Sequence, residues 1–235
     1  ASAGALDLAG AARSEQRALM RGVCSAPALV LIFCGAEAFS MAGFALVPSL
    51  LPQLSRQWSL SATQGGWLGG IFFLGYILAV PLLVSLTDRI DARRVYLASA
   101  GLSGLALAGF ALFSNGFAAA LAWWWLAGLG LAGTYMPGLK ALTDRLPMTS
   151  QSRGTAFYTA TFGVGAGLSY LWIELLQGLL PWSALFAVAA ACAFLSVLLV
   201  WLGVAAVARP AGPRGGHSHW RAVLGDRRVL AFCGG

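Results

Sequence analysis

The chain has 235 residues, of which 59% are apolar and 10% are charged, and its net charge is +7. Soluble domains carry about 25% charged residues, so this composition excludes a soluble globule with a solvated surface and also excludes a disordered chain. Cysteines are far apart and form no CxxC pair, which gives no indication of a disulfide framework, a zinc site or any other cofactor. They are Cys24, Cys34, Cys192 and Cys233.

Long apolar runs recur along the chain, and a helix that crosses a bilayer needs about 20 such residues. The runs are continuous rather than alternating, which excludes the strands of a membrane barrel. We therefore predict an all-α membrane protein with six transmembrane helices. The six runs are 26–51, 64–86, 95–113, 117–139, 155–178 and 182–206.

Turn and charge signals separate these runs and divide the chain into segments. Residues 52–63, 88–94 and 140–153 are polar interruptions, and Asn115-Gly116 and Pro181-Trp182 are short corners. The predicted organisation is an N-terminal tail (1–25), a helical bundle (26–206), a Pro/Gly-rich linker (207–228) and the start of a seventh helix (229–235). The chain begins without Met and stops inside that helix, so we expect it to be the N-terminal part of a longer protein.

Basic residues fall almost entirely on one side of this topology. If the N-terminus is cytoplasmic, 14 of the 15 Lys and Arg residues lie inside, and Arg56 alone lies outside. This asymmetry is the positive-inside pattern of a multi-pass protein in the cytoplasmic membrane of a bacterial-type cell. The positive charge is thereby explained as a topology signal, and the predicted partner is the lipid bilayer, not a nucleic acid.

The loop after the second run carries a recognisable motif. It reads Val84-Ser-Leu-Thr-Asp88-Arg89-Ile-Asp91-Ala92-Arg93-Arg94 and resembles the loop between helices two and three of the major facilitator superfamily, G-x-L-A-D-R-x-G-R-[RK]. Asp88, Arg89 and Arg93 match the pattern, whereas Val84, Asp91 and Ala92 depart from it.

This resemblance implies the N-terminal half of a secondary transporter. The fold would be a 3+3 repeat bundle, working with a missing C-terminal half as a permease or symporter that moves a small-molecule substrate by alternating access. It also implies an inside gate in which Asp88 meets the second half. Asp144, at the end of the fourth run, is in plausible reach of Arg89 or Arg93. The alternative is that these charges only flank the membrane.

The fourth and fifth runs are rich in glycine. The fourth matches the superfamily's R-x-x-x-G-x-G at Gly128 and Gly130 but has Trp124 in place of the arginine, which puts coupling through that arginine in doubt. Tryptophans 123–125 suggest an interfacial aromatic belt. The spaced pairs 65/69, 66/70 and 163/167 are expected to pack helices closely.

Glu37 and Glu174 are the acidic residues inside the apolar runs. Glu37 is ten residues past Pro27, hence about 15 Å deep and near the midplane, where a carboxyl usually faces a cavity and is a candidate to carry a proton. Glu174 is expected near the outer surface. The resemblance makes Tyr135 and Tyr158 candidate cavity residues. The open alternatives are a neutral, hydrogen-bonded Glu37 and structural tyrosines.

Two other function classes were weighed. Gly101-Leu-Ser103-Gly104 matches the GxSG of intramembrane serine proteases, but the histidines, His217 and His219, lie in the linker and leave Ser103 without a base. No Gly-rich phosphate loop with a Lys occurs, so no ATPase is encoded. We expect the protein not to be an enzyme. A membrane scaffold or assembly factor remains the alternative to a transporter, and it would tolerate Glu37→Gln.

Overall fold

The computed structural model describes residues 25–206, and every regular element in this range is helical. The predicted linker, the start of the seventh helix and all but the last residue of the predicted tail lie outside the described residues. The elements are α2 (Ala26–Ser40), η1 (Met41–Gly43), α3 (Leu46–Trp58), α4 (Ala62–Leu86), α5 (Ala92–Phe113), α6 (Phe117–Thr143), α7 (Met148–Leu176) and α8 (Trp182–Gly203).

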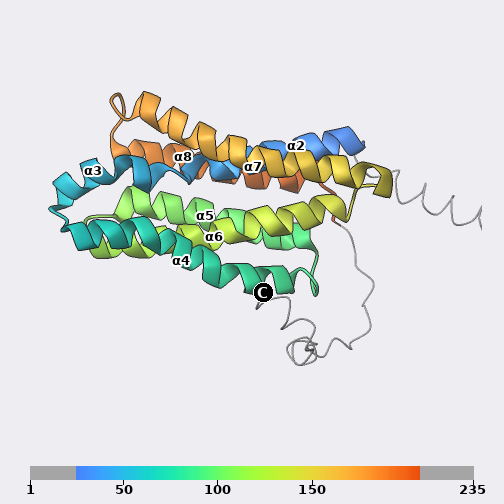
Figure 1. The fold of residues 1–235 in the computed structure, drawn as a ribbon, viewed down its shortest axis with the longest axis horizontal. Coiled ribbons are helices and arrows are strands. Elements are labelled where there is room, and N and C mark those ends of the chain that lie inside the picture. Colours follow the sequence, from blue (N-terminus) through green and yellow to red (C-terminus); the bar gives the residue numbers. More distant parts are fainter. Residues whose placement is uncertain (1–24, 207–235) are drawn as a thin grey trace, which may run out of the picture.

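The helices run back and forth between the two ends of an elongated bundle (Figure 1). Helices α4, α5 and α6 lie together on one side, and α2, α3, α7 and α8 lie on the other. Helix α6 packs on α4 and α5, and α8 joins the two sides through contacts with α5 and α2. Helix α7 packs mainly on α2.

Five of the described spans are long and apolar enough to cross a membrane: Ala26–Trp58, Ala62–Leu86, Ala92–Phe113, Phe117–Thr143 and Trp182–Gly203. The described residues thus form an all-helical bundle with several helices suited to cross a membrane, as predicted. Helix α7, the fifth predicted crossing, is long enough at 29 residues but is less apolar because it is rich in Ser, Thr and Gly.

Two predicted interruptions are wrong in their extent. The first crossing does not stop at residue 51, because α3 continues to Trp58 with Pro52 inside it. The polar stretch 140–153 is mostly helical, since Lys140 lies in α6 and Arg153 lies in α7. The predicted boundaries were placed where polar residues begin. Membrane helices can extend beyond the hydrocarbon, however, and their ends then contain polar residues.

The first crossing is broken at its middle by η1. Pro48 has no backbone N–H and therefore suits the first turn of a restarted helix, which begins at Leu46. Helix α7 satisfies backbone groups that the break frees. Ser169 Oγ donates to Ala42 O at 2.9 Å and accepts from Ala45 N–H at 3.0 Å, and Trp172 Nε1 donates to Ala42 O at 3.0 Å.

Side-chain caps define the starts of two helices. Ser61 and Gln64 form a capping box at the start of α4, in which each side chain accepts from the other residue's backbone N–H. Asp91 Oδ1 accepts from Arg93 N–H at the start of α5. The departure from the superfamily motif at Asp91 therefore supplies a helix cap.

The closest helix contacts involve other glycines than the predicted pairs. A Cβ at Gly128 would collide with the Phe72 carbonyl of α4, and one at Gly130 would collide with the Ser103 backbone of α5. Gly66, Gly70 and Gly163 have open space around the Cβ position, as do Gly69 and Gly167. The prediction that these five glycines pack helices of this chain together is therefore wrong, because they lie on faces of α4 and α7 that point away from the bundle.

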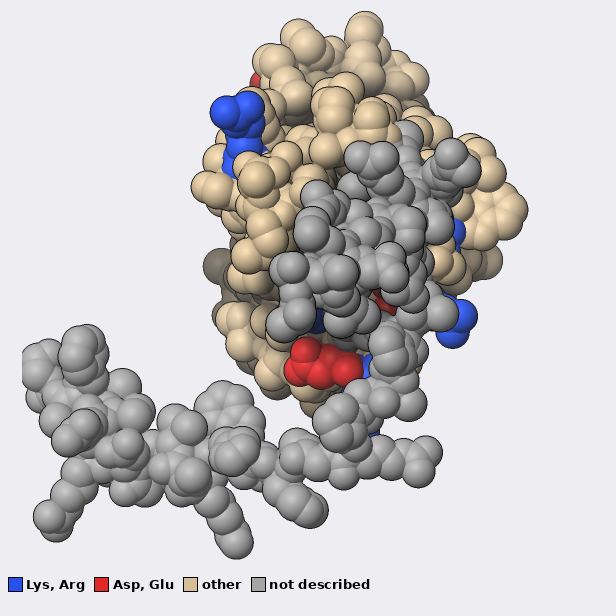
Figure 2. All heavy atoms as spheres, turned by 90° about the vertical axis from the view of Figure 1, so that its right-hand side faces the viewer, with Lys and Arg blue, Asp and Glu red and all other residues tan. Residues whose placement is uncertain are grey.

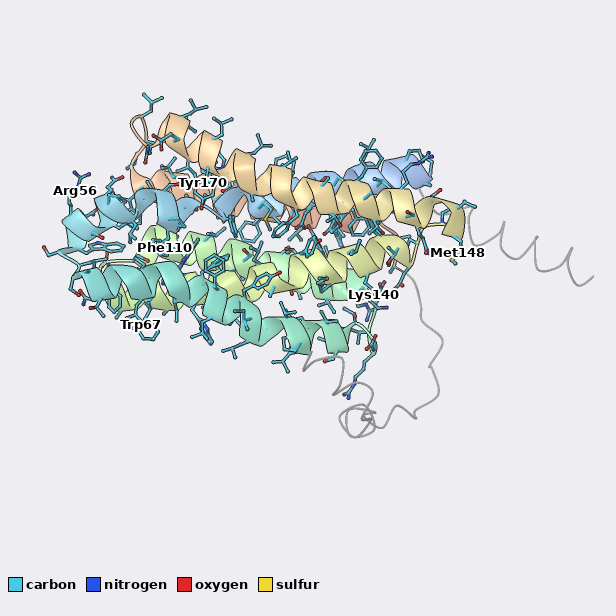
Figure 3. The ribbon with its side chains drawn as sticks, in the orientation of Figure 1. Arg56, Trp67, Phe110, Lys140, Met148 and Tyr170 are labelled. Atoms are coloured by element: carbon cyan, nitrogen blue, oxygen red, sulfur yellow. The ribbon has the colours of Figure 1, made fainter. Side chains whose placement is uncertain are left out.

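One end of the bundle carries most of the described positive charge. Arg56 lies at one end, and Lys140 lies at the other, close to Met148 (Figure 3). Arg89, Arg93, Arg94, Arg145 and Arg153 also belong to the Lys140 end by their positions in the helices. Figure 2 looks onto this end and shows basic and acidic side chains there. We call it the basic end.

Candidate functional site

Glu37 lies between two apolar clusters that follow one another along the bundle. One cluster, towards the end that holds Arg56, contains stacked aromatic rings such as Phe110 and Phe186, whose centroids are 3.9 Å apart. The other, towards the basic end, includes Phe33 and Tyr96. Glu37 precedes the break in the first crossing by one turn, so a buried carboxyl and an interrupted helix coincide.

The Glu37 side chain is fully buried, with 0% of its surface exposed. Its Oε2 accepts a hydrogen bond from Tyr158 Oη at 2.9 Å and lies 3.3 Å from the Ser40 hydroxyl, which also donates to Glu37 O at 2.9 Å. A carboxyl buried at this position depends on such donors. Helices α2 and α7 therefore meet through Glu37 and Tyr158.

Tyr158 extends this contact to α6. Its hydroxyl lies 3.1 Å from Thr134 O, and its ring stacks on Tyr135 with centroids 5.9 Å apart. Tyr135 also packs against Phe162, and its hydroxyl reaches Thr159 Oγ1 at 3.5 Å. The structure thus brings the three predicted residues Glu37, Tyr135 and Tyr158 together. Whether they bind a substrate or couple transport stays a prediction.

A groove of about 480 Å³ runs along α2 and α7 near the basic end. Its lining includes Val30, Cys34, Arg153 and Phe157. Cys34 is three residues before Glu37, so the groove comes within one helical turn of the carboxyl. Arg153 places a cation beside this groove. This position could not be foreseen from the sequence, where residue 153 only ends the polar interruption 140–153.

Arg145 ties three helix ends together at the basic end. Its guanidinium binds Asp91, with an N–O distance of 2.8 Å, and both side chains are more than nine-tenths buried. It also donates to Ala141 O in α6 and to Ala205 O beyond α8. Arg93 adds a bond of 2.8 Å to Trp201 O. Cations suit these positions because carbonyls at helix C-termini carry partial negative charge.

The predicted gate residues surround this cluster. Asp88 and Arg89 are exposed in the turn between α4 and α5. Asp144 lies 3.8 Å from Lys140 Nζ, and Arg93 contacts α8. A pairing of Asp144 with Arg89 or Arg93, and the role of all four residues as a gate, stay predictions.

Sequence reasoning missed several residues of these networks. Ser40, Thr134 and Ser169 are common residues in helices. The partners of Thr134 O and Ser169 are distant in sequence, whereas Ser40 bonds to Glu37 one turn away. The fully buried Tyr96, whose polar neighbours include Ser40 and Ser196, was also missed. Trp124 is 1% exposed and stacks on Phe72, so its assignment to an interfacial belt is wrong. Its position at the arginine of the superfamily motif was the available signal that it faces the protein.

Comparison with known proteins identifies the family. The family model of the Major Facilitator Superfamily matches residues 33–235, which is most of the chain. The chain belongs to the Major Facilitator Superfamily. The resemblance in the 84–94 loop is thereby confirmed over a much longer stretch of sequence.

Two individual proteins give further comparisons. A niacin transporter, NiaP of Acinetobacter baylyi, is 24% identical over 120 residues, which are 51% of this chain and 27% of that protein. The crystal structure of the POT family transporter PepTSo matches with a TM-score of 0.68 and 16% identity, covering 83% of this chain and 41% of the other. The latter shows a shared fold. In both comparisons the chain spans less than half the length of the known protein.

Proposed function

We propose that this superfamily chain is the N-terminal half of a secondary active transporter that moves a small solute by alternating access. The observation that carries the proposal is Glu37, a fully buried carboxyl beside the break in the first membrane crossing. Transporter sites of this kind lie near the midplane on interrupted helices. The fold shared with PepTSo and the sequence similarity to NiaP support it.

The second half would face the open sides of α4 and α7. Both helices expose large apolar side chains, such as Ile77 and Leu82 on α4 and Leu171 and Leu175 on α7. Five glycines with open Cβ positions also lie on these two helices: Gly66, Gly69 and Gly70 on α4, and Gly163 and Gly167 on α7. Rocking of one half against the other would expose the Glu37 region to each side of the membrane in turn.

Glu37 would couple solute movement to protons. A buried carboxyl can be neutral or ionised, and Tyr158 and Ser40 supply hydrogen-bond donors that the ionised form needs. The 480 Å³ groove supports a route from the basic end towards this carboxyl. With that end cytoplasmic, as the concentration of positive charge favours, protons would leave Glu37 on the inside.

Asp88, Arg89, Arg93 and Asp144 would form the inside gate. Asp88 and Arg89 are exposed at the basic end and therefore able to meet the second half. Arg93 and the Arg145–Asp91 pair hold α5, α6 and α8 together behind them. In this arrangement, a rigid inner cluster positions a surface pair that makes and breaks contacts with the other half.

Solute uptake by the full-length protein in proteoliposomes tests the proposal. Radiolabelled niacin is the first solute to assay, because a niacin transporter is among the similar proteins, followed by a panel of small organic acids and bases. We expect uptake driven by an imposed pH gradient, and we expect Glu37→Gln to reduce it about tenfold or more, which corresponds to about 1.4 kcal/mol.

Glu174→Gln is the matched control, since it makes the same chemical change on an exposed residue near the end of α7. This variant should transport at the wild-type rate. Normal uptake by Glu37→Gln would remove the coupling role, and absence of uptake of every solute by the wild type would favour a scaffold.

A further inference from the structure

The Tyr158 hydroxyl has two acceptors but only one proton. Glu37 Oε2 lies at 2.9 Å and Thr134 O at 3.1 Å from Tyr158 Oη. A phenol donates one hydrogen bond and can accept another through its oxygen. Tyr158 can therefore donate to the carboxyl of α2 or to the backbone of α6, but not to both at once.

The protonation state of Glu37 decides between these two bonds. An ionised carboxylate only accepts, so Tyr158 donates to it. A protonated carboxyl can donate to the Tyr158 oxygen, and the tyrosine proton then turns to Thr134 O. Rotation of the Tyr158 hydroxyl is therefore enough to satisfy both forms of Glu37 without movement of heavy atoms. The ionised form accepts a hydrogen bond from Tyr158, and the protonated form donates one to it.

Thr134 O belongs to a weakened turn of α6. Pro137 lies inside this helix and has no N–H, so the carbonyl four residues earlier, that of Gly133, loses its usual intrahelical partner. The next residue, Gly138, packs so closely on Tyr158 that a Cβ would collide with the hydroxyl. Tyr158 therefore contacts α6 where its hydrogen bonding is reduced and where helices commonly bend.

The titratable groups around Glu37 come from several helices. They are Tyr76 of α4, Tyr96 of α5, Tyr135 of α6 and Tyr158 of α7, with Cys34 on α2 itself. Helix α8 contributes Ser196, a hydroxyl beside Tyr96 that does not titrate. Among these neighbours, the Tyr158 hydroxyl is within hydrogen-bond distance of both the Glu37 carboxyl and a backbone carbonyl of α6. The relay can thus be assigned to one side chain.

We propose that Tyr158 is a positioning residue that links the protonation state of Glu37 to the stability of the proline-weakened turn of α6. When Glu37 is protonated, Tyr158 donates to Thr134 O and fixes this turn against α7. When Glu37 is ionised, Tyr158 donates to Glu37 and releases the turn. The inference rests on the proposed function and deepens it, since protonation of Glu37 on α2 would change how firmly α6, a helix of the same site, is held against α7.

Hydrogen–deuterium exchange of residues 134–142 in the full-length protein tests this relay without any solute. Exchange is compared at an acidic and an alkaline pH after correction for the intrinsic pH dependence. We expect about fivefold slower exchange at acidic pH in the wild type, the effect of one hydrogen bond of about 1 kcal/mol. Glu37→Gln should show the same exchange rate at both pH values, because its amide does not titrate.

Tyr158→Phe should show fast exchange at both pH values. Tyr170→Phe, which makes the same change on an exposed residue of the same helix, should keep the wild-type difference. A pH response that persists in Glu37→Gln or in folded Tyr158→Phe would overturn the relay. The Glu37→Gln result decides the matter even if Tyr158→Phe does not fold. Because the measurement does not involve solute, it separates failure of the relay from failure of the transport proposal.

Discussion

Arg145 and Asp91 form a buried ion pair at the basic end of the bundle. The guanidinium touches α5, α6 and the residues that follow α8, so a single side chain fixes three helix ends. Separate removal of either charge leaves the other one buried without its partner, and this is the costly case for such pairs. Arg145 therefore contributes to stability, whereas Asp88 and Arg89 are exposed and free to act in a gate.

Replacement of Arg145 by Met should destabilise the protein by about 3–5 kcal/mol, because Asp91 remains buried and charged. The double variant Arg145→Met/Asp91→Asn removes the buried charge, keeps the cap of α5 and should recover most of this loss. Unfolding in mixed micelles measures both effects, with Arg94→Met as an exposed control that should be neutral. Equal stability of Arg145→Met and wild type would contradict the role of this pair.

Single residues of the site could be predicted unevenly from the sequence. Glu37 was found because a carboxyl in an apolar run is rare and costly, and the superfamily resemblance pointed to Tyr135 and Tyr158. Thr134 contributes only a carbonyl, which every residue has. Arg145 and Asp91 are 54 residues apart, and nothing in the sequence distinguishes them from flanking charges. Their pairing depends on how the helix ends are placed in space.

At the level of elements, close contact between α4 and α6 depends on small residues in α6. The apolar runs predicted the helices well, because hydrocarbon requires internally bonded backbone. The glycine spacing did not identify the contacts, since the same spacing occurs on faces that point outwards. Gly128 and Gly163 differ in what surrounds them, not in their sequence context.

Gly128→Ala tests this contact directly. The added Cβ would collide with the Phe72 carbonyl, which is backbone and cannot turn aside, so α4 must move away from α6. We expect a loss of about 1–3 kcal/mol of stability, as for an overpacked core. Gly101→Ala in α5 is the control, with open space at the Cβ position and no expected loss. Thermal unfolding of both purified variants compares them, and equal midpoints would show that α4 and α6 are not so tightly packed.

On the scale of the whole molecule, the chain combines a charged end, a buried polar site and apolar faces on α4 and α7. The sequence predicted the first two features, because charge asymmetry and a carboxyl inside an apolar run are visible without a structure. It could not predict the broken first crossing, since Pro48 is equally compatible with a kink, a helix end or a restart. The break depends on Ser169 and Trp172, which bind the freed backbone groups from α7.

The central claim is that solute movement is tied to a proton on Glu37. The most direct test uses membrane vesicles that contain the full-length protein in a weakly buffered medium. A transported solute is added without an energy source, and the pH of the medium is recorded. Wild-type vesicles should make the medium alkaline as protons enter with the solute, and Glu37→Gln vesicles should exchange solute without any pH change. Equal alkalinisation by both proteins would contradict the account.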